Sequence, residues 1–293
     1  MTRALQLQGL VFCTAALVLV IANAAGARLS LRDEVVLAGA LLLLLGMPHG
    51  AFDALIARRL FGIASFRAWA LFSLCYVSLA AVVVVCWVVA PTAFLAAFLT
   101  ASAWHFGGDP ATGASRPSRF LYGGAVIVLP ALWHGAELQQ LLSLVAGPTS
   151  AAVVAPVLHQ LAAPWLAATI LLAVAQAKTS RVAACEWAAL AALAVVAPPL
   201  AAFSVYFCLM HSPRHVLKTM TGLPATELRH ALALALWPTL AVLVAAGLLG
   251  RLTRDMPAEA GVMQIVFVGL AALTLPHMLL LERARRTSLV GDG

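Results

Sequence analysis

Long apolar runs recur along the whole chain, and they constrain its fold more than any other feature. The first run extends from Leu5 to Ala25, and stretches of comparable length follow it to the end of the sequence. A helix needs about 20 predominantly apolar residues to cross the hydrocarbon core of a bilayer. Only 10% of the 293 residues are charged, whereas a soluble domain carries about a quarter. These runs predict an all-α, polytopic transmembrane helical bundle.

Prolines and glycines divide the apolar sequence into about ten predicted spans, with eight to ten as the expected range. Residues 182–218 would reach about 55 Å as a single helix, whereas the hydrocarbon core is about 30 Å thick. Pro198-Pro199 lies in the middle of this stretch, so two helices are expected there. No long polar segment occurs, and residues 1–293 are expected to form a single integral membrane domain. The predicted helices are 6–25, 35–57, 66–90, 92–108, 119–145, 153–177, 182–197, 199–218, 229–250 and 261–281.

The basic residues lie in short loops and are distributed unevenly between the two sides of the membrane. With ten spans, one side receives fourteen of the 18 Lys and Arg residues, and the other side receives four. Because Lys- and Arg-rich loops stay in the cytoplasm, both termini are expected to be cytoplasmic and the protein to lie in the plasma membrane. These loops account for the net charge of +7, and no nucleic-acid partner is expected.

Ionisable side chains inside predicted spans are costly and therefore mark candidate functional positions. Under the ten-span topology, five histidines fall in the later part of helices that run toward the cytoplasm. They are His49, His105, His211, His215 and His277. Their common depth predicts that they converge in the cytoplasmic half of the membrane.

The spacing of these residues favours a metal site. His211 and His215 are four residues apart, so one helix face presents both imidazoles to a single ion. His49 and Asp53 have the same spacing, and Asp53 could orient an imidazole through its second nitrogen or bind the metal itself. A histidine set without cysteine and with few carboxylates suits iron, copper, zinc or nickel, and argues against calcium or magnesium. The residues alone do not select among these four metals.

Four residues, one of them the His277 already named, are candidates for the wall of a substrate cavity. His134 and His277 are single intramembrane histidines, and each could line a cavity or form a hydrogen bond that holds two helices together. Trp104 and Phe106 flank His105 and are the aromatic candidates.

The same motifs, in this order and spacing, resemble the Brp/Blh family of bacterial and archaeal beta-carotene 15,15'-dioxygenases. The resemblance rests on Pro48-His49-Gly50-Ala51-x-Asp53, Trp104-His105-Phe106-Gly107 and His211-x-x-x-His215, supported by Pro276-His277 near the end. The length and the all-membrane character of the chain are also similar. Two features depart from the family pattern: Ala54 stands where many relatives are expected to have a histidine, and the loops are rich in arginine.

This resemblance implies an enzyme that depends on Fe(2+), splits the central double bond of beta-carotene with O₂ and gives two molecules of all-trans-retinal. It implies His49, His105, His211 and His215 as iron ligands, with Asp53 as a polar partner in the catalytic site. Beta-carotene is a hydrocarbon that dissolves in the lipid bilayer, so we expect it to reach such a site laterally between helices. The resemblance also implies that retinal is handed over to a rhodopsin-type protein.

Two other classes of membrane protein also place histidines inside spans. A transmembrane haem electron carrier with bis-histidine ligation would do so, although it normally needs a pair of histidines across the haem. A transporter that relays protons through His and Asp would use intramembrane ionisable residues. Internal repeats would favour a transporter, and none is evident in the sequence.

Overall fold

The computed structural model describes residues 3–110, 115–220 and 225–287, and every regular element in these ranges is helical. The all-α prediction is therefore confirmed. In chain order the elements are α1 (Arg3–Ala24), α2 (Leu31–Leu41), η1 (Leu42–Gly46), η2 (Met47–Phe52), α3 (Asp53–Phe61), α4 (Phe66–Val89), α5 (Pro91–Phe106), α6 (Arg116–Val128), η3 (Leu129–Leu132), α7 (Gly135–Ala146), α8 (Pro148–Ala177), α9 (Arg181–Val196), α10 (Pro199–Tyr206), η4 (Phe207–His211), α11 (Ser212–Met220), α12 (Ala225–Leu252), α13 (Ala258–Met263), η5 (Gln264–Val268) and α14 (Gly269–Arg286).

The predicted break in the stretch 182–218 is confirmed. Helix α9 ends at Val196, and α10 begins at Pro199. Ala197 between them has an extended backbone with φ −84° and ψ 154°. The reason is steric, because the ring of a proline drives the preceding residue out of the α conformation.

The predicted count of about ten spans is not confirmed. Among the described residues, six helical stretches are long and apolar enough to cross a membrane, or seven if the pair 116–132 and 135–146, bent by 114°, forms one span. Helices α5 and α9 have only 16 residues each, below the length of about 17–25 residues that a span needs. The six stretches are Arg3–Ala24, Leu31–Phe61, Phe66–Val89, Pro148–Ala177, Glu227–Leu252 and Ala258–Arg286. These stretches support the prediction of a helical membrane protein, although not the predicted number of spans.

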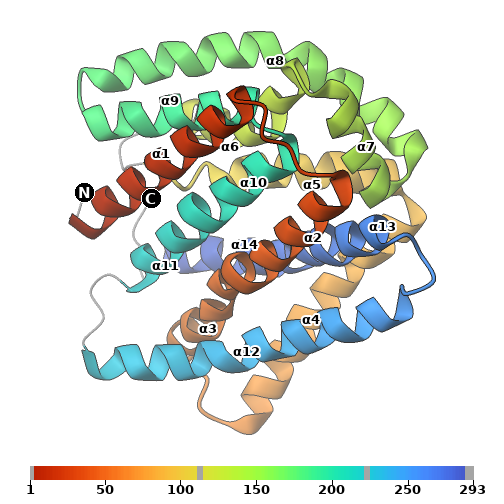
Figure 1. Ribbon diagram of the computed structural model, residues 1–293. Coiled ribbons are helices and arrows are strands. Elements are labelled where there is room, and N and C mark those ends of the chain that lie inside the picture. Colours follow the sequence, from red (N-terminus) through yellow and green to blue (C-terminus); the bar gives the residue numbers. More distant parts are fainter. Residues whose placement is uncertain (1–2, 111–114, 221–224, 288–293) are drawn as a thin grey trace.

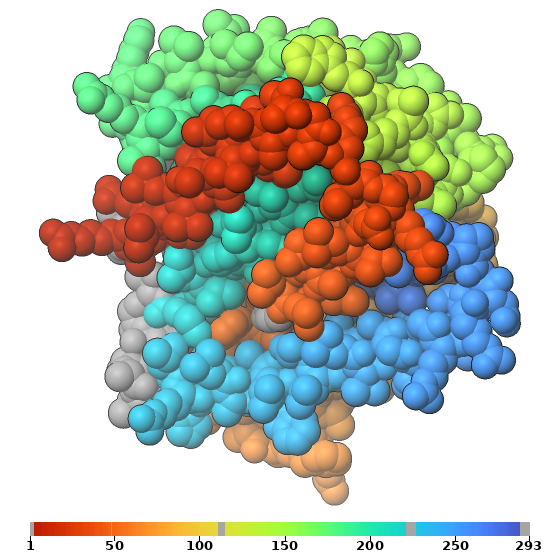
Figure 2. All heavy atoms as spheres, in the orientation of Figure 1, coloured from red at the N-terminus to blue at the C-terminus, as the bar shows by residue number. Residues whose placement is uncertain are grey.

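The helices form a bundle with distinct outer and inner members. Figure 1 shows α1, α8 and α9 on one side, α4 and α12 on the other, and α10, α11 and α14 between them. The outer helix α4 has no buried residue, whereas eight residues of α14 are buried. Exposed apolar side chains of α1, α2 and α12 contribute to the face in Figure 2, as expected for helices that face lipid.

A buried polar network ties α1 and α9 to α11. Arg214 is 2% exposed, and its two terminal nitrogens donate to the Glu186 carboxylate at 2.9 and 2.6 Å. Its Nε donates to Gln8 Oε1 at 2.7 Å, and its Nη1 also donates to the Asp109 carbonyl at 3.2 Å. A buried charge is stable only when it is paired and hydrogen-bonded. This network therefore holds α11, which carries a candidate metal ligand, in one position.

Close packing at a glycine sets the position of α5 against α6. A Cβ atom on Gly123 would lie 2.1 Å from the Ala103 carbonyl oxygen and 2.5 Å from the Gly107 nitrogen. Only the absence of a side chain allows the two backbones to approach this closely. The end of α5, where His105 lies, is consequently held against α6.

Candidate metal centre

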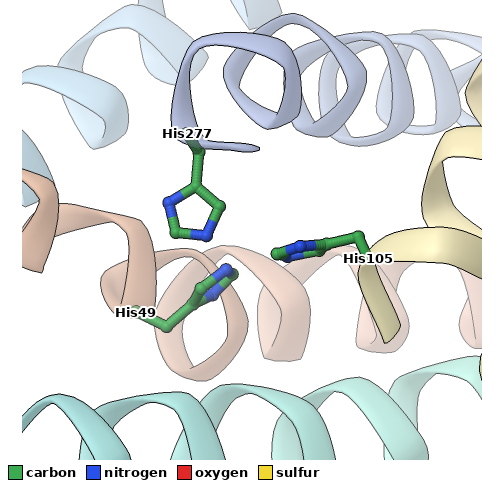
Figure 3. Close-up of side chains that lie close together, drawn as sticks. All are labelled: His49, His105 and His277. Carbon is green, nitrogen blue, oxygen red and sulfur yellow. The ribbon is translucent and has the colours of Figure 1, made fainter. Parts of the chain in front are cut away.

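Histidines from several segments of the chain form one cluster inside the bundle. His49, His105 and His277 each offer one ring nitrogen, and these three atoms lie within 4.8 Å of one another. Figure 3 shows their rings directed toward a common space from η2, α5 and α14. The ring centroids of His49 and His277 are 5.5 Å apart, and those of His105 and His277 are 5.1 Å apart.

His211 and His215 belong to the same cluster. The centroid of the His211 ring lies 4.7 Å from that of His105 and 5.1 Å from that of His49. The His215 ring lies 5.0 Å from His277 and 5.6 Å from His49. The predicted convergence of these five histidines is therefore confirmed, and the i, i+4 pair faces the other three.

Irregular helical turns accompany two of these histidines. A π-helical turn, η1, is followed directly by the 3-10 turn η2, which contains His49. A second π-helical turn, η4, ends at His211. Such turns change the angle between successive side chains, and π turns are frequent at functional sites. They direct these two imidazoles differently from a regular α-helix.

Three of the imidazoles are oriented by hydrogen bonds through Nδ1. His49 donates to the Gly46 carbonyl at 2.6 Å, and His277 donates to Asp53 Oδ1 at 2.7 Å. The Nδ1 of His211 lies 3.1 Å from both carboxylate oxygens of Asp109. Each of these bonds leaves the Nε2 atom of its ring available to a ligand, which is the usual arrangement of histidines that bind metals.

Asp53 therefore contacts a histidine, and its partner is His277 rather than His49. Its second oxygen accepts a hydrogen bond from the Tyr76 hydroxyl at 2.8 Å. The aspartate is 3% exposed, so both of its oxygens are used within the protein.

Asp109 is a functional candidate that sequence reasoning missed. It is 4% exposed, contacts His211 and accepts a hydrogen bond from the Tyr206 hydroxyl at 2.5 Å. The signal that could have revealed it is its position four residues after His105, directly after Gly107-Gly108. A carboxylate so close to a candidate metal-binding histidine is a candidate partner for an imidazole.

The donor set fits a transition-metal ion. The Nε2 atoms of His211, His215 and His277 are buried and have no hydrogen-bond partner among the described residues. Buried polar atoms normally have a partner, and a cation bound between these imidazoles would satisfy all three. Nitrogen donors with nearby carboxylates that orient them are typical of iron, copper, zinc and nickel sites.

A cavity of about 630 Å³ adjoins the cluster. His49, His105 and His277 lie in its wall, and most of the remaining lining residues are apolar, many of them from α4 and α12. Phe106, predicted as a cavity residue, is buried and also lines this space. The arrangement places a mostly apolar cavity beside a candidate metal site.

The other two cavity candidates lie elsewhere. The His134 Nε2 lies 3.2 Å from the Val196 carbonyl oxygen, and its Nδ1 lies 3.3 Å from Glu137 Oε2. His134 therefore joins two helices, and it is in contact with none of the five clustered rings. Trp104 is 55% exposed and lines a different cavity, between α4, α5 and α14.

Comparison with known proteins identifies the family of this chain. The sequence model of the family described as beta-carotene 15,15'-dioxygenase matches residues 40–283. A beta-carotene 15,15'-dioxygenase from an uncultured marine bacterium is 34% identical over 257 residues, which cover 83% of this chain and 91% of that protein. A probable beta-carotene 15,15'-dioxygenase Blh from Halobacterium salinarum is 30% identical over 273 residues, with 80% and 79% covered. No solved structure gives a significant match. The chain therefore belongs to the beta-carotene 15,15'-dioxygenase family.

Proposed function

We propose that this protein cleaves the central double bond of beta-carotene with O₂ and releases two molecules of all-trans-retinal. The observation that carries the proposal is the histidine cluster in the wall of an apolar cavity, in a chain whose relatives are named for this reaction. Beta-carotene has no polar group, so a mostly apolar cavity is the appropriate receptor for it.

The proposed cofactor is Fe(2+), held by His49, His105, His211 and His215. His277 is a candidate fifth ligand, because its ring nitrogen lies within 4.8 Å of those of His49 and His105. When bound, ferrous iron would supply the activation of dioxygen that oxidative cleavage of a carbon–carbon double bond requires.

The protein's own residues prepare the site for this chemistry. Asp53 and Asp109 fix the tautomers of His277 and His211, so that each Nε2 carries a lone pair toward the common space. The apolar wall, including Phe106 and Phe207, excludes water and confines the polyene beside the histidines. This confinement would place one double bond of a long conjugated chain next to the histidines that would hold the iron.

Substrate reaches the cavity from the bilayer between α4 and α12. The cavity is lined by Tyr76 and other residues of α4 and by Trp237 and other residues of α12. Helix α4 has no buried residue, and Trp237 is 73% exposed, so both helices form the outer wall. A C40 hydrocarbon partitions into lipid, and entry between these two helices would deliver it without passage through water.

We also propose that the protein lies in the plasma membrane with both termini in the cytoplasm, because of the uneven distribution of basic residues. Reporter fusions after residues 150 and 198 should then be external, and fusions at residue 222 and the C-terminus cytoplasmic. An external signal at residue 222 would contradict this topology. In cells with a rhodopsin-type protein, the retinal would be handed over to it.

Co-expression in a carotene-producing bacterium tests the reaction. Cells with the wild-type protein should lose their orange colour and accumulate retinal, whereas cells with His49→Ala should stay orange at equal protein levels. Persistent colour with well-inserted wild-type protein would contradict the proposal. A red pigment with a Soret band in the purified protein would instead indicate a haem carrier.

A further inference from the structure

A second cavity, of about 910 Å³, lies along α5 and α14. Its apolar wall is formed by side chains of α4, α5 and α14, among them Val82, Phe94, Phe98 and Leu279. His105 lies in the wall of this cavity and also in that of the cavity beside the histidine cluster. The two cavities therefore adjoin at His105, but the polar residues that line them differ.

Four arginines gather at one end of this second cavity. Arg116 and Arg119 come from the start of α6, and Arg285 and Arg286 come from the end of α14. One carboxylate, that of Glu282, lines the cavity with them, and it accepts a hydrogen bond from Arg286 Nε at 3.1 Å. The lining thus carries an excess of positive charge at this end.

The guanidinium groups from the two helices approach the same point. At Gly108, the ideal Cβ position lies 3.5 Å from Arg285 Nη2 and 3.9 Å from Arg119 Nη2. Arg119 is anchored there, because its Nε donates to the Gly107 carbonyl at 2.8 Å. Lys218 adds a further cation, since its Nζ donates to the Gly108 carbonyl at 2.7 Å. Cations from three segments therefore lie close to Gly108, and those of Arg119 and Arg285 also line the cavity.

We propose that this cavity binds an anionic phospholipid, with its phosphate at Arg119 and Arg285 and an acyl chain along α5 and α14. Guanidinium groups bind phosphate oxygens through paired, charge-assisted hydrogen bonds. Basic pockets between membrane helices are typical receptors for anionic headgroups. The apolar length of the cavity favours a lipid over free phosphate, and the arginines favour a charged headgroup over a hydrocarbon. The inference does not depend on the proposed reaction.

Native mass spectrometry of the delipidated full-length protein in detergent tests this proposal. Phosphatidylglycerol and phosphatidylcholine with identical acyl chains are titrated separately, and inorganic phosphate is added as a competitor. We expect one phosphatidylglycerol to bind in clear preference to phosphatidylcholine, and millimolar phosphate to leave it bound. Equal affinity for the two lipids, or displacement by phosphate, would overturn the lipid assignment.

Matched variants locate the headgroup. Arg285→Gln should weaken phosphatidylglycerol binding by at least about tenfold, the factor expected for one lost charged hydrogen bond. Arg283→Gln is the control, because Arg283 lies on the same helix, is exposed and is not part of the cavity wall. Arg285→Lys keeps the charge without the paired geometry and should give an intermediate affinity even if the glutamine variant folds poorly. Equal losses in the 283 and 285 variants, or no loss at 285, would refute the site.

Discussion

Replacing Asp53 by Asn tests whether this aspartate orients a histidine or binds the metal itself. In the structure, one oxygen of Asp53 accepts from His277 Nδ1 at 2.7 Å and the other accepts from the Tyr76 hydroxyl at 2.8 Å. Asparagine has nearly the same volume but only one accepting oxygen and no charge, so the charge-assisted hydrogen bond that orients His277 is weakened or lost. Loss of a hydrogen bond to a charged group costs about 1.5–3 kcal/mol. This cost corresponds to a roughly 10–100-fold weaker metal affinity, the range typical of residues that orient metal ligands.

The assay is a chelator competition for iron on purified protein, combined with retinal yield in the same preparation. His49→Ala, which removes a proposed ligand, provides the reference for complete loss. Tyr76→Phe is the matched control, because it removes one hydrogen bond to Asp53 and leaves the His277 contact intact, so its effect should stay below about tenfold. If Asp53→Asn lost iron as completely as His49→Ala, the aspartate would be a metal ligand. Unchanged affinity would refute the orienting role.

Three further substitutions test the architecture of the site. Asp109→Asn should weaken iron binding by about 10–100-fold through His211, measured by the same chelator competition. Gly123→Ala should push α5 away from α6 and lower both the iron content and the midpoint of thermal unfolding in detergent. Gly247→Ala is the control and should leave both unchanged, because no atom lies within 4 Å of the Cβ position at Gly247. Arg214→Met should lower the free energy of unfolding by about 3–5 kcal/mol, because Glu186 is left as a buried charge. A double variant that also carries Glu186→Leu should recover part of this loss. A double variant as unstable as Arg214→Met would contradict this explanation.

Several features of this protein follow from local sequence alone. The helical membrane class depends on apolar runs, because any segment of sufficient length and hydropathy partitions into lipid as a helix. The break between α9 and α10 depends on Pro198-Pro199, because two consecutive prolines remove two backbone donors and drive the preceding residue out of the α conformation. The common face of His211 and His215 depends only on helical periodicity. The sequence also predicted that the five histidines converge, although the ten-span topology used for that prediction is not confirmed.

The number of spans was not predictable in the same way. Apolar composition does not distinguish a helix that crosses the bilayer from a shorter one that packs within the bundle, such as α5 and α9 with 16 residues each. Tilt and depth are set by contacts with neighbouring helices. The close approach at Gly123 is one such contact, and nothing in the sequence around Gly123 identifies the backbone that it meets.

Only the tertiary structure showed which residues the two single histidines contact. The His277 ring lies in the cluster and donates to Asp53, a residue 224 positions away, whereas His134 lies beside the Val196 carbonyl. The Asp109–His211 pair is likewise separated by 102 positions. Periodicity and composition report on neighbours within a few residues, whereas the partners that orient a metal ligand come from other helices. The sequence by itself therefore determined the helical class and the histidine set, and long-range packing decided which carboxylate supports which imidazole.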